Sequence, residues 1–204
     1  MKLWYSPASP FVRKVLVVAH ETGQMGDLQV TDASTNAVNR NMELVRDNPS
    51  GKIPALVLDD GTVLFDSRVI CAYLDSRHSG KKLAPQDGPI RFQDMMLEAL
   101  GDAIMDAAVL ARYEAALRPE PLRWAAWSEG QMAKVTSSLD QLEGPLSAML
   151  KGEPTMGLIA IACALGYLDY RFADMGWRDT HPKLAQWFTE ISSRPSMQAS
   201  APEA

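Results

Sequence analysis

Two serines stand where helices are expected to begin, and each could hold a negatively charged group. Ser9 comes directly before Pro10, and this pair is a strong helix-start signal. Ser67 follows Asp66 at the start of a second predicted helix. The free N–H groups in the first turn of a helix bind anions, and a hydroxyl adds another donor. On the residues alone, helix capping is the simpler interpretation of both positions, and binding of an anion is the alternative.

The stretch 48–67, which reads NPSGKIPALVLDDGTVLFDS, leads up to the second of these positions. Residues 55–58 predict a short strand, Asp60-Gly61 a turn, and residues 63–65 the returning strand. Lys52 precedes this hairpin and is a candidate partner for a ligand carboxylate, although a solvated loop lysine is the alternative. A hairpin edge followed by a helix start indicates a site for a short peptide.

The elements that must position these residues follow a regular order. Residues 2–5 predict a strand, 10–22 a helix and 27–31 a second strand, followed by a segment of weak helical character up to residue 47. The full order is strand, helix, strand, helix, strand, strand, helix. This order predicts a mixed sheet with helices on both faces.

The rest of the chain is expected to be helical. A stretch rich in Gly, Pro and Lys at 80–89 predicts a linker between a first domain, 1–79, and a second, 90–204. Residues 91–116 and 122–150 show helical periodicity, and 159–168 is apolar nearly all round, which predicts a helix buried on every side.

Composition argues against several classes of function. The chain has 204 residues and a net charge of −5, which gives no sign of nucleic-acid binding. No apolar run is long enough to span a membrane, and the first residues do not form a signal peptide. Cys71 and Cys163 lie in apolar helical patterns, which fits a reduced, cytoplasmic setting. The three histidines are scattered without ligand spacing, so no metal site is expected.

Together with residues 1–22, the stretch 48–67 resembles the thioredoxin-like domain of cytosolic glutathione transferases, in particular a bacterial type that carries Ser-Pro-Phe, here residues 9–11. Three later pieces resemble the all-helical second domain of that family: DGPIRFQDMMLEALGDAIMDA, IAIACALGYLDYRF and HPKLAQWFTEISSRPSM. The resemblance implies an α/β thioredoxin-like domain followed by an all-α domain.

The resemblance also implies a role for Ser9, because related enzymes place a Ser, Cys or Tyr near this point to hydrogen-bond the glutathione sulfur. A hydroxyl donor and the positive end of a helix both favour a thiolate over a thiol. Lowering a thiol pKa of about 8.5 by two units needs only about 2.7 kcal/mol. Ser6 and Tyr5 are the alternatives for this role, in that order.

The remaining glutathione contacts follow from the same resemblance. Ile53-Pro54 matches the family's cis-proline, beside which the backbone of the preceding residue pairs with the glutathione cysteinyl backbone, and a trans proline is the alternative. Asp66 and Ser67 match an acidic-Ser pair that holds the γ-glutamyl ammonium and carboxylate. Lys52 is expected to join this site.

Three expectations concern the helical domain. The family usually begins the buried helix with Ser or Thr followed three residues later by Asp, whereas this chain has Thr155 and Leu158, which predicts a weaker cap if nothing replaces the acid. Asp102 or Asp106 is a candidate to reach the ligand of a neighbouring subunit. Met105 and Tyr113 are candidates to face the second substrate. The sequence does not decide among them.

The sequence is thus expected to encode a cytoplasmic, homodimeric glutathione transferase that serves detoxification. Glutathione is its co-substrate, no further cofactor or metal is expected, and the second substrate is a small hydrophobic electrophile. Two alternatives remain at this point: a non-catalytic interaction module of the same architecture, and a glutathione-dependent isomerase or lyase.

Overall fold

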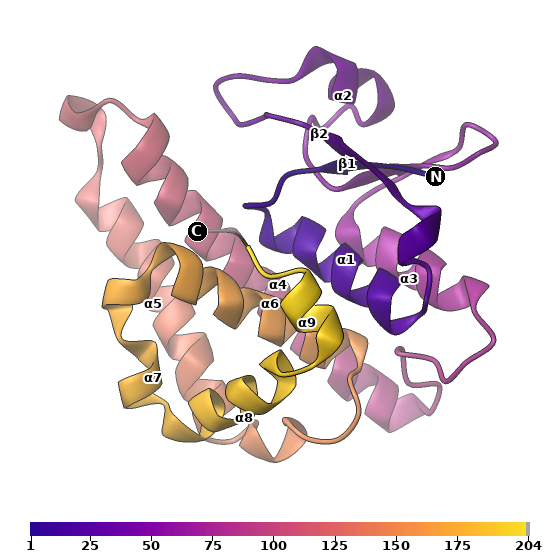
Figure 1. Ribbon diagram of the computed structural model, residues 1–204. Helices are drawn as coiled ribbons and strands as arrows, with labels where there is room; N and C mark the ends of the chain where they lie inside the picture. The colour runs from indigo at the N-terminus through magenta and orange to yellow at the C-terminus, as the bar shows by residue number, and fades with distance from the viewer. Residues whose placement is uncertain (203–204) are drawn as a thin grey trace. The chain divides into compact units, whose positions relative to one another are not determined.

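A mixed β-sheet and a set of helices form two separate units in the computed structural model, which describes residues 1–202 (Figure 1). The first unit contains Met1–Arg91 together with the residues from Pro195 onward, and the second contains Phe92–Arg194. The predicted fold class, a thioredoxin-like domain and an all-helical domain, is confirmed.

The sheet of the first unit has four strands in the order β2-β1-β3-β4. Their bounds are β1 Lys2–Tyr5, β2 Gln29–Asp32, β3 Ala55–Val57 and β4 Val63–Leu64. β1 pairs in parallel with β2, whereas β3 runs antiparallel to both β1 and β4. The strand predicted at 27–31 begins two residues later than expected, because Met25–Asp27 forms a 3-10 turn.

Helices cover both faces of this sheet, as the element order predicts. Figure 1 shows α1 (Pro10–Glu21) and α3 (Ser67–Arg77) together on one face and α2 (Met42–Asp47) on the other. Most of the apolar positions expected to face the core along α1 are buried: Val12, Val15, Leu16, Val18 and Ala19. Phe11, which was expected among them, is only half-buried. On the opposite face of the sheet, Trp4, Ala33, Leu44 and Ala55 form a buried cluster.

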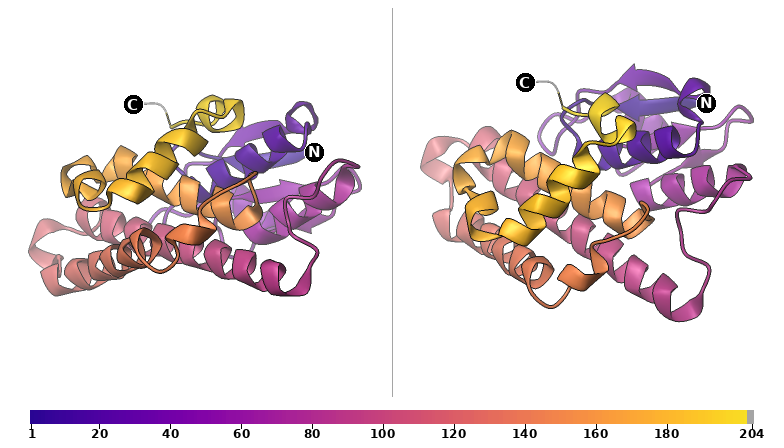
Figure 2. Two further views of the ribbon diagram at one scale, coloured as in Figure 1. Left: turned by 90° about the horizontal axis from the view of Figure 1, so that it is seen from below. Right: turned by 60° about the horizontal axis from the view of Figure 1, so that its bottom comes forward.

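The C-terminal helix α9 (Pro195–Ala199) packs beside α1 and therefore belongs to the first unit (Figure 2). The Arg13 guanidinium donates to the Met197 carbonyl at 3.0 Å, and the Ser196 hydroxyl bonds the Glu21 carboxylate. The second unit thus ends at Arg194, whereas the predicted helical domain runs to residue 204.

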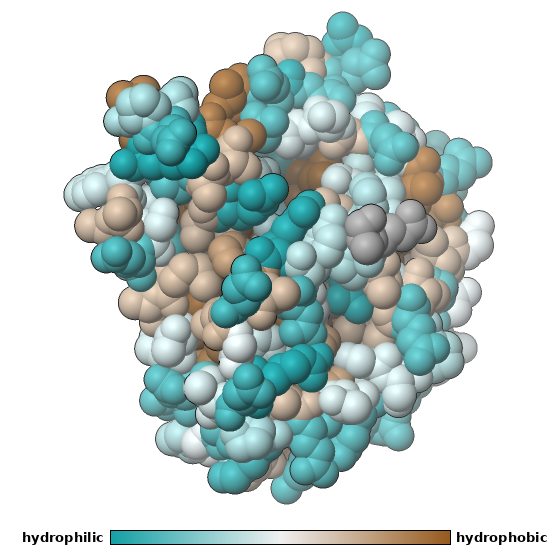
Figure 3. All heavy atoms as spheres, turned by 60° about the vertical axis from the view of Figure 1, so that its left-hand side comes forward, coloured by the Kyte–Doolittle hydropathy of each residue, from teal (hydrophilic) through white to brown (hydrophobic). Residues whose placement is uncertain are grey.

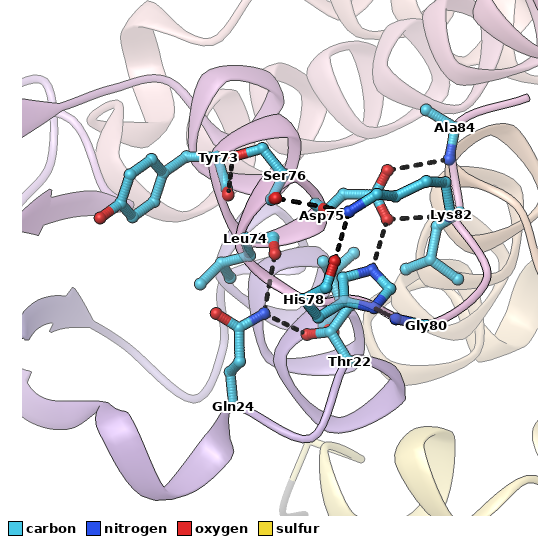
Figure 4. A network of polar contacts seen from close by, with 12 residues as sticks. Thr22, Gln24, Tyr73, Leu74, Asp75, Ser76, His78, Gly80, Lys82 and Ala84 are labelled. Atoms are coloured by element: carbon cyan, nitrogen blue, oxygen red, sulfur yellow. Dashed lines mark hydrogen bonds and ion pairs between the residues drawn. The ribbon is translucent and has the colours of Figure 1, made fainter. Parts of the chain in front are cut away.

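The end of α3 is tied to the segment that follows it (Figure 4). The buried Asp75 carboxylate accepts from the Leu83 and Ala84 N–H groups at 2.8 and 3.2 Å and contacts the His78 ring at 3.0 Å. The Lys82 ammonium donates to backbone carbonyls in the last turn of α3, at Asp75 and Ser76, and to the carbonyl of His78, which follows the helix. The cation thus satisfies carbonyls that the helix itself cannot pair.

The second unit is built from helices alone. It contains most of α4 (Gly88–Leu117), then α5 (Ala125–Glu143), α6 (Met156–Arg171), α7 (Trp177–Thr180) and α8 (Pro182–Ser192), with 3-10 turns at Glu120–Leu122, Ser147–Met149 and Ala173–Met175. Every residue of α6 from Met156 to Leu168 is buried, as its uniformly apolar sequence predicts. This helix is the core of the unit.

Helix α6 begins with a cap that the sequence alone does not reveal. The Thr155 hydroxyl accepts from the Leu158 N–H at 3.3 Å, as an N-cap does. Asp94 of α4 then supplies the missing acid: its carboxylate bonds the Thr155 hydroxyl and accepts from the Gly157 N–H at 3.1 Å. Burial raises the pKa of Asp94, although these two hydrogen bonds oppose the rise. The cap is therefore complete, but it contains a buried carboxylate.

Two glycines allow α4 and α6 to approach closely enough for this bond. A Cβ at Gly157 would lie 2.5 Å from the Asp94 carbonyl, and one at Gly101 would lie 2.6 Å from the Ala160 backbone. Neither distance is possible for real atoms, so larger residues would force the helices apart.

The described part of the chain has no single helix that is long and apolar enough to cross a membrane, although α6 and the segment Ala173–Thr180 pass that test as a bent pair, by length and composition only. On the face drawn in Figure 3, strongly apolar residues lie in small groups with hydrophilic residues between them. Groups of this size are ordinary on protein surfaces and do not indicate a docking site.

The cap from Asp94 generates a prediction about stability. Replacing Asp94 by Ala should lower the free energy of unfolding by about 1–3 kcal/mol, because the Gly157 N–H loses its buried partner. Asp94→Asn should cost less, since an amide oxygen can accept the same bond. Urea unfolding measures both, with the exposed Glu129→Ala as the control for loss of a carboxylate from the same unit.

The same variants test the direction in which folding shifts the pKa of Asp94. The folded-state pKa is raised, so the stability of the wild type relative to Asp94→Asn should fall as the pH rises from the unfolded-state pKa, about 4, through the folded-state value. A difference between the two proteins that stays constant with pH would contradict the raised pKa.

Candidate functional site

Three chain segments meet at one end of the sheet in the first unit. β1 and β3 are antiparallel with Trp4 opposite Ala55, so the chain leaving β1 lies beside the chain entering β3. β3 and β4 are antiparallel with Leu56 opposite Leu64, so the chain leaving β4 reaches the same end. These segments carry Ser6 to Ser9, Ile53-Pro54 and Asp66-Ser67. Strand pairing therefore gathers the residues that the sequence singled out.

Ser9 is the N-cap of α1. Its backbone is extended, and its hydroxyl oxygen accepts from the Val12 N–H at 3.3 Å. A hydroxyl that accepts this bond still has its own hydrogen to donate. Capping and donation to a ligand are thus compatible for Ser9, and the two interpretations of this residue do not exclude each other.

Ser6 and Tyr5 lie just before this cap. The Ser6 carbonyl accepts from the Ser9 N–H at 3.1 Å, which closes a turn between β1 and α1. Tyr5 is the last residue of β1, is half-buried and pairs with Asp32 across the sheet. Ser6 begins the turn that ends at Ser9, and Tyr5 directly precedes it, so both stay alternatives for contact with a ligand sulfur.

The Ile53-Pro54 peptide bond is cis, as the resemblance implies. Ile53 packs against the buried cluster around Trp4 and Leu44. Within residues 1–202, no hydrogen bond uses the backbone of Ile53. Backbone groups without a partner at the edge of a sheet can pair with an extended peptide.

Asp66 and Ser67 form the start of α3. The Asp66 carboxylate is the N-cap, accepting from the Arg68 N–H at 3.0 Å, and this side chain is exposed. Ser67 is only 2% exposed, yet no hydrogen bond within the described residues uses its hydroxyl. Because buried hydroxyls usually have a partner, this one is suited to a ligand at the first turn of α3.

Lys52 lies in the loop before the cis bond and is exposed. Its ammonium forms no ion pair with any described residue, which leaves it available for an anion. The loop itself is held by Asn48, a residue with no role predicted from the sequence. Asn48 is 2% exposed; its side chain accepts from the Ser50 N–H and hydroxyl at 3.1 and 2.8 Å and donates to the Lys52 carbonyl at 2.8 Å.

The candidates in the helical unit divide by burial. Asp102 is buried and Asp106 exposed, and each has interactions within the chain. Met105 is fully buried, whereas Tyr113 is half-buried. Among the described residues, no group of three or more His, Cys, Asp or Glu side chains could hold a metal ion.

Comparisons with known proteins give matches to both parts of the chain. Residues 8–77 match the family description "Glutathione S-transferase, N-terminal domain", and residues 125–190 match "Glutathione S-transferase, C-terminal domain". The GST-like protein YibF of Escherichia coli (strain K12) is 35% identical over 99% of this chain and 98% of its own length.

The chain belongs to the glutathione transferase family.

Solved structures of the family extend the likeness to three dimensions. A glutathione transferase family member from Pseudomonas fluorescens Pf-5, solved with bound glutathione, is 49% identical, with a TM-score of 0.97 over 100% of this chain and 99% of that one. A second structure of a family member from that organism holds S-(propanoic acid)-glutathione and is 48% identical, with a TM-score of 0.92 over 100% of both chains.

The Asn48 side chain yields a prediction for this member of the family. Asn48→Ala should make the Ser50 amide exchange with deuterium at least about tenfold faster, because the Ser50 N–H loses its side-chain acceptor. Hydrogen-exchange mass spectrometry of the segment 49–53 measures this rate.

Asn41→Ala is the matched control, since it removes the N-cap of α2 and so destabilises the same unit without touching the loop. If both variants increase the amide exchange rate of residues 49–53 equally, the Asn48 side chain does not specifically stabilise this loop.

Proposed function

We propose that this protein is an enzyme that conjugates glutathione to a small electrophile. The observation that carries the proposal is the meeting of the Ser9 cap, the open backbone of Ile53 and the unpaired Ser67 hydroxyl at one end of the sheet. The bound glutathione in the Pseudomonas fluorescens structure, together with 49% identity, supports the choice of ligand.

In the proposed complex, each group of the tripeptide meets a matching group of the first unit. The γ-glutamyl carboxylate receives hydrogen bonds from Ser67 and the α3 N-terminus, while its ammonium faces the exposed Asp66 carboxylate. The cysteinyl backbone pairs with Ile53 beside Pro54 as an added strand. Lys52 attracts a remaining carboxylate.

Ser9 acts on the sulfur. Its hydroxyl donates to the thiolate while its oxygen still caps α1, and the positive end of that helix adds to the stabilisation. Both interactions lower the pKa of the thiol, so more thiolate is present near neutral pH. The thiolate forms a bond to an electrophilic carbon, and the leaving group departs from that carbon with its electron pair.

The S-(propanoic acid)-glutathione held by the second Pseudomonas fluorescens structure favours transfer over mere binding, because an S-substituted glutathione has the form of a transfer product. We propose a cytoplasmic setting, in agreement with two buried free cysteines, and a role in removing reactive electrophiles.

Ser9 provides the test of the catalytic proposal. Ser9→Ala should lower kcat/KM for conjugation of 1-chloro-2,4-dinitrobenzene by more than about tenfold with little change in glutathione affinity, because the sulfur loses its donor. A spectroscopic pH titration of bound glutathione should show a higher thiol pKa in the variant.

Ser9→Gly separates the hydroxyl from the cap, because Gly retains most of the capping stability without a donor. An equal loss of kcat/KM in both variants supports donation to the sulfur. If kcat/KM recovers in Ser9→Gly, Ser9 only caps the helix. The same assay of Tyr5→Phe and Ser6→Ala tests whether Tyr5 or Ser6 donates to the sulfur instead. Glutathione binding without turnover of any tested electrophile would rule out the transferase and favour a binding module.

We also propose that the enzyme is a homodimer. The first turns of α4 expose four large apolar side chains, Ile90, Phe92, Met95 and Met96, and Phe92 is 70% exposed. Phe92, Met95 and Met96 are spaced i, i+3 and i+4 and therefore share one face of the helix, and an exposed apolar face of this kind is typical of an interface.

Phe92→Glu should therefore shift the protein toward monomer in light scattering after gel filtration. Leu122→Glu is the control, because Leu122 is exposed to a similar degree at the other end of α4, in the 3-10 turn that follows it. Equal masses for Phe92→Glu and the wild type would contradict an interface at this helix.

A further inference from the structure

Helix α2 is attached to the sheet of the first unit through a carboxylate. Asp47, the last residue of α2, accepts from the Trp4 indole N–H at 2.6 Å and from the Lys2 ammonium at 3.0 Å. Lys2 and Trp4 are two residues apart in β1, so both side chains point to the face of the sheet that α2 covers (Figure 1). The Lys2 ammonium also lies 4.1 Å from the centre of the Trp4 ring. We name Lys2, Trp4 and Asp47 the α2 clamp.

The Asp47 carboxylate is ionised at neutral pH. Burial acts to raise its pKa, but the hydrogen bonds from Trp4 and Lys2, together with the charge of Lys2, lower the pKa below its ordinary value. Hydrogen bonds to an ionised group are stronger than neutral ones, and Trp4 is only 4% exposed, which shields its bond from water. The clamp therefore adds a polar attachment to the apolar contact that Leu44 of α2 makes with the same face of the sheet.

Residues 35–52, which contain α2, hold one another through their own hydrogen bonds. The Thr35 hydroxyl donates to the Gly51 carbonyl at 3.1 Å, and the Arg40 guanidinium donates to the Pro49 carbonyl at 2.9 Å. The chain before α2 is thus bonded to the loop after it. A segment joined in this way is expected to shift as one piece when its attachment to the sheet is lost.

The loop at the end of this segment carries Lys52, the proposed partner of a glutathione carboxylate. Asp47 and Asn48 are consecutive residues: Asp47 bonds β1, and the Asn48 side chain donates to the Lys52 carbonyl at 2.8 Å. The position of Lys52 relative to the sheet therefore depends on the clamp. Ser9 and Ser67 differ in this respect, because they belong to the starts of α1 and α3.

We propose that Asp47 is a positioning residue for recognition of the glycyl carboxylate of glutathione: through the α2 clamp, it holds the Lys52 ammonium where that carboxylate binds. This inference rests on the proposed function. Asp47 is itself an acid, so by charge alone it repels an anionic ligand, and neutralising it would tighten binding. The clamp predicts weaker binding instead, because loss of the attachment displaces Lys52. The sign of the change in affinity decides between the two effects.

Glutathione and its glycinamide analogue, γ-Glu-Cys-Gly-NH2, differ only in the charge of the glycyl end. Calorimetry should show that the wild type binds glutathione at least about tenfold more tightly than the analogue, because only glutathione forms the charged hydrogen bond with Lys52. Asp47→Ala should raise the Kd for glutathione at least about fivefold and change the Kd for the analogue by no more than about twofold. Asp47→Asn should lie between, since its amide oxygen can still accept from the Trp4 N–H.

Glu43→Gln is the matched control for charge. It also removes one negative charge from α2, but the exposed Glu43 carboxylate has no bond to any described residue. This variant should bind glutathione as tightly as the wild type or slightly more tightly. Unchanged or tighter glutathione binding in Asp47→Ala, or equal changes in Asp47→Ala and Glu43→Gln, would overturn the proposal.

Trp4→Phe tests the clamp from the side of the sheet. It keeps an aromatic ring in the buried cluster and changes no charge, but it removes the indole N–H that Asp47 accepts. The preference for glutathione over the analogue should fall at least about threefold. A merely structural role would weaken binding of both ligands alike, so the ratio of the two Kd values is the decisive quantity. A wild-type ratio in this variant and in Asp47→Asn contradicts the role of the clamp.

The binding experiment stands apart from the transferase proposal because it needs no turnover. If no electrophile is conjugated but the preference falls as described, the transferase proposal fails and the role of Asp47 stands. If conjugation occurs while Asp47→Ala keeps the wild-type preference, the role of Asp47 fails and the transferase stands. If the wild type binds both ligands equally, neither the Lys52 contact nor the role of Asp47 holds.

Discussion

The pairing of β1, β3 and β4 is the constraint on which the candidate site depends. Because β3 is antiparallel to both neighbours, the chain enters it at the end where the other two strands finish. A shift of one residue between β1 and β3 would turn the buried side chains of β3 toward the opposite face of the sheet. The core that fixes the register, including Trp4 and Ala55, thus also fixes where Ser9 stands relative to Pro54.

Much of this arrangement could be predicted from the sequence, because it rests on local signals. Alternating and helical patterns gave the strands and helices of the first unit, and Ser9 and Asp66 carry standard cap chemistry. The cis bond at Pro54 was different: cis is uncommon for proline in general, and only the resemblance to a family indicated it. The residues of each segment predicted its local structure and the kind of group it could bind. Only the resemblance to the family predicted that these segments form one site for glutathione.

The features that the sequence did not reveal depend on partners far along the chain or on burial. Asp94 lies about 60 residues before Thr155, and nothing in its own helix distinguishes it from an ordinary surface acid. Asn48 belongs to an Asn-Pro-Ser-Gly run that reads as a turn, and only its burial shows that the side chain holds the Lys52 loop.

In both units, helices begin with N–H groups that have no partner within the helix. The two units differ in how completely other groups of the chain pair with them. At α6, the Thr155 hydroxyl and the Asp94 carboxylate fill the cap, and burial excludes any ligand. At α1, Ser9 accepts one N–H but keeps its hydrogen, and at α3 the Ser67 hydroxyl forms no bond within the described residues. At the helix starts of the first unit, hydrogen-bond donors therefore remain without an acceptor, and an anionic ligand can accept from them. Because pairing these donors would stabilise the folded state, ligand binding and stability of this unit are expected to be linked.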